Sequence, residues 1–133
     1  MSTEDPIRIL VVDDEPDMRR YLASMLRENY RIIEAPDGIT ALEKAKEQKP
    51  DLILLDINMP GQNGYEICKL LKEDPKTQEI PVIFISALDD VLDKVQAFSV
   101  GGVDYITKPF QVEEVLARVE THLTIRTLQK ELE

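Results

Sequence analysis

The 133-residue sequence has one cysteine, Cys68, and no tryptophan. A single cysteine can form neither an internal disulfide nor a cysteine-built zinc site, so a reducing cytoplasm is the expected compartment. Cys68 falls among apolar positions of a helical segment, which indicates a buried structural thiol. No apolar run approaches the roughly 20 residues that a membrane-spanning helix needs, so we expect no membrane association.

Basic residues are also in short supply. The chain has 16 Lys and Arg against 26 Asp and Glu, which gives a net charge of -10. Direct binding to nucleic acid requires a basic surface and is therefore not expected. The acidic excess favours a divalent cation as a ligand, although scattered surface acids are the commoner cause of such a charge. The 43% apolar and 32% charged residues are typical of one folded globular domain.

Five apolar runs alternate with five segments of helical periodicity. The predicted strands are 7–12, 31–35, 52–55, 82–85 and 103–107, and the helical segments are 16–26, 39–45, 67–71, 91–98 and 111 onward. This alternation is typical of an α/β fold in which helices cover both faces of a parallel sheet. For five strands the flavodoxin-like order 2-1-3-4-5 is the common solution. We therefore expect an (α/β)5 three-layer sandwich with an extended C-terminal helix.

Polar side chains end four of these strands. Asp13 and Asp14 follow the first strand, Asp56 the third, Ser86 the fourth and Lys108 the fifth. Because parallel strands end at one edge of the sheet, these groups should meet there. Carboxylates in one pocket repel by roughly 4 kcal/mol per pair at 4 Å and a dielectric near 20, and Mg2+ would remove that penalty. Asp56 could then act as a nucleophile toward a phosphoryl group, with Lys108 as counter-charge and Ser86 as hydrogen-bond donor.

The pattern resembles the receiver domain of two-component response regulators over residues 7–122. The matching motifs are Val11 to Glu15, Asp51 to Gly64, Ile85 to Ala87 and Tyr105 to Phe110. The resemblance implies a signalling switch rather than an enzyme with turnover, since such a domain catalyses only its own phosphorylation and dephosphorylation.

The resemblance also assigns roles at the site. Asp56 would be the phosphoacceptor, with a histidine kinase as donor. Asp13, Asp14, Asp56 and the backbone carbonyl of Asn58 would hold Mg2+, with Asp13 acting largely through water. Ser86 and Lys108 would contact the phosphoryl group.

Further expectations follow for the switch itself. Tyr105 would turn inward when Ser86 is drawn to the phosphate, and the Lys108–Pro109 peptide would be cis. The surface formed by residues 91–98, 103–107 and the helix from 111 would change its affinity for an output domain or partner. Leu88 offers no group to orient attacking water, which predicts a slow loss of phosphate.

The sequence leaves two other classes of function open. One is a pseudo-receiver that binds partners without phosphorylation. The other is an aspartate-nucleophile phosphatase of the haloacid dehalogenase type. That class is less favoured, because its two acids after the first strand are separated by one residue, whereas Asp13 and Asp14 are adjacent here and the expected nucleophile, Asp56, follows the third strand. A nucleotide or flavin binder is disfavoured, since no glycine-rich loop follows the first strand.

Structural interpretations compete at single residues. Asp14 could cap the first helix, Ser86 could cap the fourth, and Tyr105 could be a half-buried strand residue. Ile39 is expected to face the core, whereas His122 is expected to be solvated.

The chain is divided into a receiver domain, residues 1–122, and a helical linker, residues 123–133. Ile125, Leu128 and Leu132 continue an apolar stripe on a rotated face of the last helix. We interpret this tail as a linker toward an output domain, and as one half of a coiled coil with a second copy of the chain. A frayed, solvated end is the alternative.

Overall fold

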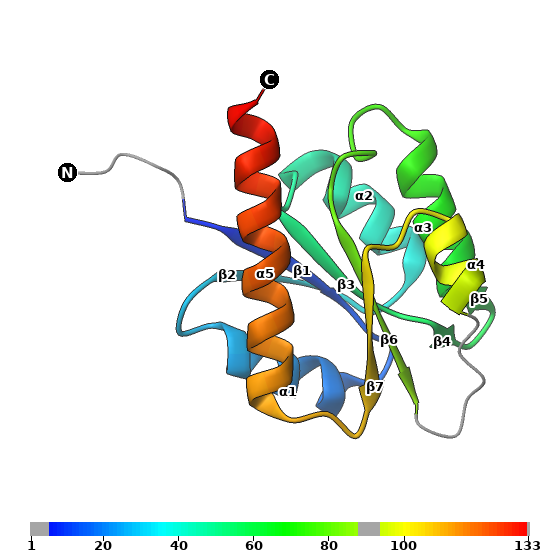
Figure 1. Ribbon diagram of the computed structural model, residues 1–133. Helices are drawn as coiled ribbons and strands as arrows, with labels where there is room; N and C mark the ends of the chain where they lie inside the picture. Colours follow the sequence, from blue (N-terminus) through cyan, green and yellow to red (C-terminus); the bar gives the residue numbers. More distant parts are fainter. Residues whose placement is uncertain (1–5, 88–93, 133) are drawn as a thin grey trace.

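A five-stranded parallel sheet forms the centre of the computed structural model, which describes residues 6–87 and 94–132 (Figure 1). In spatial order its strands are β2 (Arg31–Ala35), β1 (Arg8–Val12), β3 (Leu52–Asp56), β6 (Val82–Ala87) and β7 (Asp104–Lys108). The predicted order is confirmed, because β6 and β7 are the fourth and fifth strands of this sheet along the chain. A short antiparallel hairpin, β4 (Asn58–Met59) and β5 (Gln62–Asn63), was not predicted.

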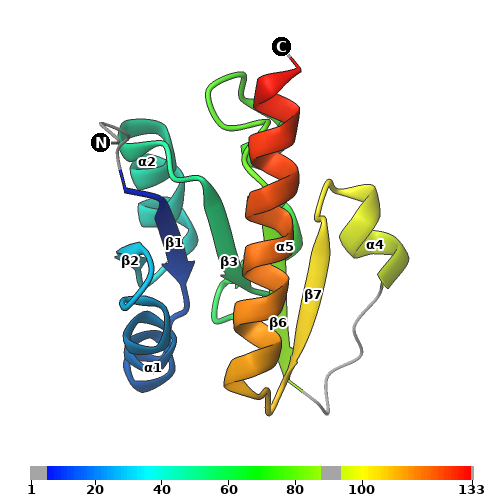
Figure 2. The ribbon, with the colours of Figure 1, turned by 60° about the vertical axis from the view of Figure 1, so that its left-hand side comes forward.

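Helices cover both faces of the sheet (Figures 1 and 2). On one face lie α1 (Pro16–Leu26) and α5 (Val112–Glu131), and on the other lie α2 (Gly38–Gln48), α3 (Gly64–Glu73) and α4 (Lys94–Ser99). Each face has its own apolar core. The flavodoxin-like three-layer arrangement is therefore confirmed.

The central strand β3 illustrates why its sequence is apolar without interruption. Successive side chains of a strand point to opposite faces. Leu52 and Leu54 pack toward α1 and α5, whereas Ile53 and Leu55 pack toward α2 and α3. All four side chains are fully buried. Asp56 follows them at the end of the strand and is itself 4% exposed.

Fewer apolar helix residues are buried against the sheet than the apolar periodicity of the sequence predicts. Ile39, expected in the core, is 63% exposed, and small residues of α2 such as Ala41 and Ala45 contact the sheet instead. Leu70 and Val95 also lie on the surface. A helix packed on a sheet buries only a narrow stripe, so an apolar residue one position off that stripe stays solvated. Cys68 is fully buried, as predicted.

The helix α5 extends well past the sheet core. Val115, Val119 and Leu123 are its buried residues, and from there to Glu131 the helix continues with Ile125 and Leu128 exposed. In the part of the chain that the structure describes, no helix combines the length and the apolarity needed to cross a membrane.

The prediction that His122 is solvated was wrong. Its side chain is 14% exposed, and its Nε2 atom lies 3.0 Å from Oδ2 of Asp104 at the start of β7. Arg118 donates to both oxygens of the same carboxylate at 3.0 Å. Burial by itself would raise the pKa of Asp104, but the hydrogen bonds from His122, the Tyr105 amide and Arg118 outweigh it and lower the pKa.

Candidate functional site

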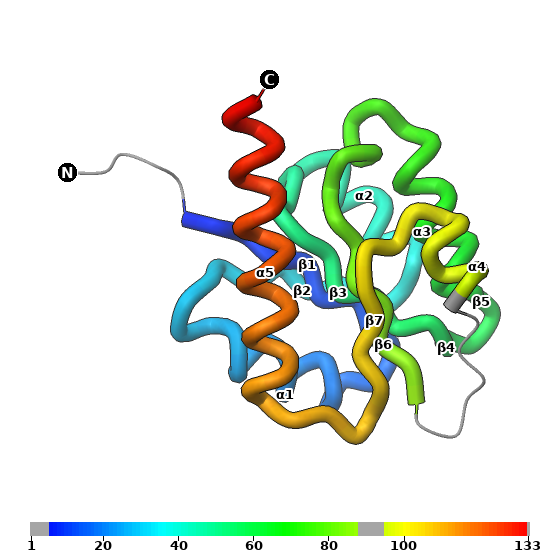
Figure 3. The backbone as a smooth tube through the Cα atoms, viewed as in Figure 1, coloured from blue at the N-terminus to red at the C-terminus, as the bar shows by residue number. Residues whose placement is uncertain are grey.

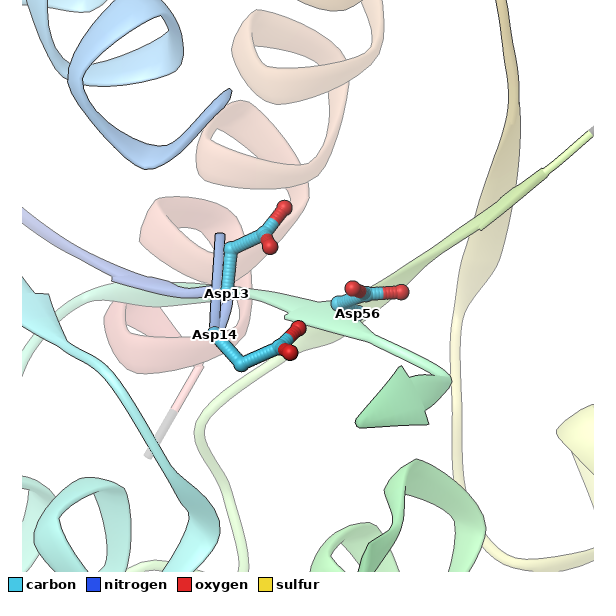
Figure 4. Close-up of side chains that lie close together, drawn as sticks. All are labelled: Asp13, Asp14 and Asp56. Carbon is cyan, nitrogen blue, oxygen red and sulfur yellow. The ribbon is translucent and has the colours of Figure 1, made fainter. Parts of the chain in front are cut away.

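Three carboxylates meet at the C-terminal edge of the sheet (Figure 4). Asp13 and Asp14 follow β1, and Asp56 ends the neighbouring strand β3. One oxygen from each of the three side chains lies within 4.8 Å of the other two. Asp13 and Asp56 are buried, whereas Asp14 is exposed at the mouth of the site. The sequence therefore correctly predicted that these three residues converge.

A lysine from a more distant strand completes the cluster. Lys108 is the last residue of β7, and its Nζ atom lies 3.6 Å from Oδ2 of Asp13 and 3.8 Å from Oδ2 of Asp56. The strand β6 separates β7 from β3, so the long lysine side chain reaches across one strand. The Lys108–Pro109 peptide bond is cis, as expected.

Backbone groups orient both buried carboxylates. The Glu15 amide donates to Oδ1 of Asp13 at 2.9 Å, and the Asn58 amide donates to Oδ1 of Asp56 at 3.1 Å. In each case the second oxygen, Oδ2, faces Lys108. Oδ2 of Asp13 is buried, and within residues 6–87 and 94–132 it has no hydrogen-bond partner.

Arg19 supports the site without having been predicted to do so. Its guanidinium donates to the backbone carbonyl of Asp13 at 2.8 Å and to the Glu34 side chain at 3.2 Å. The contact joins the first turn of α1 to the residue that follows β1. No motif in the sequence indicates it, because the distance between the two residues depends on how α1 enters the fold.

The charges at the site are unbalanced. Burial, and then the neighbouring charge of Asp13, raise the pKa of Asp56 to about 6, although Lys108 opposes this shift. Oxygen ligands from carboxylates are those that Mg2+ prefers. Oδ2 of Asp13, which accepts no hydrogen bond from the described residues, and the excess negative charge therefore fit a hard divalent cation held by Asp13, Asp14 and Asp56.

The site opens into a cavity of about 430 Å³. Its lining includes the four charged residues above together with Glu15, Asn58, Pro60 and Ala87. Ser86 is buried beside it, one residue beyond Ile85, which pairs with Asp56 in the sheet register. Its hydroxyl donates to the Ala87 carbonyl at 3.3 Å.

Three other expectations from the sequence concern Tyr105, Asp14 and Leu88. Tyr105 lies away from the cavity, where its ring packs against Phe98 of α4 at 6.4 Å. The N-cap of α1 is Glu15, so the interpretation of Asp14 as a cap was wrong. Leu88 lies outside the described residues.

The chain after Asp56 runs through the β4–β5 hairpin into α3 (Figure 3), and glycines occupy two positions of this segment. Gly61, at the tip of the β4–β5 hairpin, has a φ of +73°, a conformation that favours glycine. Gly64 opens α3 and donates to the Ile57 carbonyl at 2.9 Å. A Cβ atom at Gly64 would lie 2.7 Å from the backbone oxygen of Asp56, so only glycine fits there without a shift.

Without metal, Asp56 should weaken the fold at neutral pH. The pKa of Asp56 is about 6 in the folded domain and near 3.8 in the unfolded chain, so the folded state binds more protons between these values. The free energy of unfolding should therefore fall as pH rises through this window. In EDTA at pH 7.5, Asp56→Asn should be more stable than wild type, by roughly 1 kcal/mol after allowance for solvent screening at the open cavity.

Chemical denaturation in EDTA measures this difference, and Asp51→Asn is a matched control at the other end of β3. Added Mg2+ should stabilise wild type and Asp51→Asn but have a much smaller effect on Asp56→Asn. A metal-free Asp56→Asn variant less stable than wild type would contradict the charge imbalance.

Comparison with known proteins agrees with this geometry. The family model for the response regulator receiver domain matches residues 9–120. The chain is 42% identical over 117 residues to RpaA of Synechocystis, a DNA-binding dual master transcriptional regulator. The matched residues cover 87% of this chain and 48% of RpaA. It is 43% identical over 126 residues to the response regulator PleD of Caulobacter vibrioides, and these residues cover 94% of this chain and 28% of PleD.

Solved structures extend the likeness to the backbone. The receiver domain of the Francisella response regulator 1452 superposes with a TM-score of 0.79 at 31% identity, covering 90% of this chain and 98% of that one. The fold and the strand-end acids thus define a regulatory domain of phosphorylation-dependent signalling. The chain belongs to the response regulator receiver-domain family. It spans less than half of the length of RpaA and about a quarter of that of PleD.

Proposed function

We propose that this domain is a switch that accepts a phosphoryl group on Asp56 from a histidine kinase. The observation that supports the proposal most strongly is the cluster of three carboxylates with Lys108 at the sheet edge, in a chain of the receiver family. Of the three acids, Asp56 alone is both nearly buried and placed at the end of the central strand β3.

The chain's own groups suit Asp56 to nucleophilic attack. The Asn58 amide holds Oδ1, which leaves Oδ2 beside the Lys108 ammonium group. We assign Oδ2 as the attacking atom: it forms the new bond to phosphorus, and the bond from phosphorus to the donor's leaving group breaks with its electron pair kept by the donor. Lys108 then lies where it can neutralise the phosphoryl oxygens, and the Ser86 hydroxyl can turn toward them from β6.

Asp13, Asp14, Asp56 and the backbone carbonyl of Asn58 would hold Mg2+. When bound, the cation would neutralise the carboxylates and the negative charge that develops on the phosphoryl group. Asp13 is the best oriented of the ligands, since the Glu15 amide fixes one of its oxygens and Arg19 fixes its backbone.

The output of the switch is assigned to the surface of α4, β7 and α5. Tyr105 lies on this surface and Lys108 ends the strand that contains it, so β7 joins the site to the surface. Occupation of the site by phosphate would shift an equilibrium between two arrangements of Ser86 and Tyr105 and so change affinity for a partner or output domain.

Residues 123–133 would connect the domain to that output. The helix α5 continues to Glu131 with Ile125 and Leu128 exposed, and its C-cap residue Leu132 is exposed too, as a helical linker or a coiled-coil partner requires. The chain spans only part of the length of RpaA and PleD, and an output domain joined to this helix is part of the proposal.

The proposal is tested by intact mass after incubation with acetyl phosphate and Mg2+. Wild type should gain one phosphoryl group, and excess EDTA should prevent the gain. A domain that is folded and binds Mg2+ but gains no mass from acetyl phosphate, nor from a phosphorylated histidine kinase, would instead be a pseudo-receiver. Steady release of phosphate from a small ester would indicate a phosphatase.

A further inference from the structure

A second cavity lies at the opposite edge of the sheet from the carboxylates. It has a volume of about 380 Å³ and lies between the C-terminal half of α5 and the connections that precede β6 and β7. Figure 2 shows the last turns of α5 beside the connection from α3 to β6. Pro81 and Val103, which immediately precede β6 and β7, form part of its wall.

Two partly buried cations line this cavity, although the chain as a whole is acidic. Lys72 comes from α3 and Arg126 from α5, and the Arg126 side chain is only 14% exposed. Burial lowers the pKa of Lys72, and the charge of Arg126 adds to this effect, although Cys68 opposes it.

The cations retain unused hydrogen-bonding capacity. Nζ of Lys72 donates to the carbonyls of Gln78 and Ile80, at 3.0 and 2.6 Å, which leaves one of its three N–H groups. Nε of Arg126 is buried, and it has no acceptor among the residues that the structure describes. Glu79 is the one acid paired with Arg126 in the described part of the chain, at 3.6 Å, and its side chain is 59% exposed.

The buried Nε–H of Arg126, which has no acceptor among the described residues, costs stability, and the other N–H groups of the guanidinium have only the exposed Glu79 as an acidic partner there. Arg126 presents its donors in a planar fork that matches the oxygens of a phosphate. Two cations balance the two charges of a phosphate monoester at neutral pH. The apolar groups of Pro81, Val103 and Ile125 offer a surface for the remainder of such a ligand.

We propose that this cavity binds a phosphate monoester that has a flat or apolar substituent, at a site separate from Asp56. The phosphate lies between Arg126 and Lys72, displaces Glu79 from Arg126, and is also within reach of Gln129. The substituent lies against Pro81, Val103 and Ile125. The volume is within the range of pockets that hold small ligands.

Isothermal titration calorimetry with adenosine 5′-monophosphate, inorganic phosphate and adenosine tests the proposal. The titrations are made in EDTA, so that no Mg2+ draws phosphate to Asp56, and on the Asp56→Asn variant as well as wild type. The monophosphate should bind both proteins with one-to-one stoichiometry, inorganic phosphate should bind more weakly, and adenosine should not bind measurably. Arg126→Gln should weaken the monophosphate by about tenfold or more, since it removes a charged hydrogen-bond donor.

Lys130→Gln is the matched control, because it removes one positive charge and one ion pair one turn further along α5, outside the cavity. It should change affinity by less than about twofold. Arg126→Lys, which keeps the charge but loses the fork, should fall between wild type and Arg126→Gln. Equal weakening by Arg126→Gln and Lys130→Gln, loss of binding in Asp56→Asn, or no saturable binding to a folded wild-type domain would overturn the proposal. Equal affinity for inorganic phosphate and the monophosphate would overturn the assignment to an ester.

Discussion

Asp56→Asn is expected to abolish incorporation of a phosphoryl group from acetyl phosphate, while Asp51→Asn retains it at close to the wild-type rate. An amide keeps the size of the side chain but is not a nucleophile toward phosphorus. The hydrogen bond from the Asn58 amide can still be accepted by the amide oxygen of asparagine, so the loop after β3 should keep its position.

Asp51 makes the comparison specific. It belongs to the same segment of chain, is also an aspartate, and accepts a hydrogen bond from the Arg8 amide at 2.9 Å. It differs in its position, at the start of β3 rather than at the end. Phosphorylation measured by intact mass should distinguish the two variants completely. If Asp56→Asn gained a full phosphoryl group, the acceptor would be another residue and the roles assigned to Asp13 and Asp14 would need to be reconsidered.

Gly64→Ala is expected to produce the largest loss of stability among the substitutions considered. The added Cβ atom would lie 2.7 Å from the carbonyl oxygen of Asp56 and 2.7 Å from Cα of Ile57. Both are backbone atoms, which cannot move aside as a flexible side chain can. Overpacking of this kind costs about 2–3 kcal/mol, which corresponds to a fall in Tm of roughly 10 °C for a domain of this size.

Gly61→Ala is the control for Gly64→Ala, because it introduces backbone strain without a steric clash with the described residues. Gly61 has a φ of +73°, and no atom of residues 6–87 or 94–132 lies within 4 Å of an added Cβ. We therefore expect a conformational penalty of about 1 kcal/mol and no clash with these residues. Gly64→Ala should also slow phosphorylation, because relief of the clash displaces Asp56 and the loop to Asn58. Thermal unfolding and the rate of mass gain measure both effects. A Gly64→Ala domain as stable as Gly61→Ala would mean that the close approach of α3 to β3 is not required.

Much of the fold could be predicted because parallel strands leave a strong pattern. A buried strand such as Leu52–Asp56 must be apolar on both faces, and a polar residue at its end marks the edge where ligands bind. Convergence of Asp13, Asp14, Asp56 and Lys108 follows from the strand order alone, since each residue ends or follows a strand.

Contacts between helices and the rest of the fold could not be predicted in the same way. The pairing of His122 with Asp104 depends on how α5 is rotated against β7, and apolar periodicity sets that rotation only within a residue or so. Arg19 reaches Asp13 for a similar reason. The cavity with Lys72 and Arg126 joins α3 to α5 across one edge of the sheet, a proximity that no local sequence pattern encodes.

The most direct test of the account is to locate the phosphoryl group in the wild-type chain. After incubation with acetyl phosphate and Mg2+, borohydride reduction converts an aspartyl phosphate to homoserine, and peptide mass spectrometry identifies the residue that changed. The account predicts homoserine at position 56 and nowhere else, with none formed when EDTA is present. Homoserine at another position, or a phosphoryl group that is acquired equally well in EDTA, would contradict it.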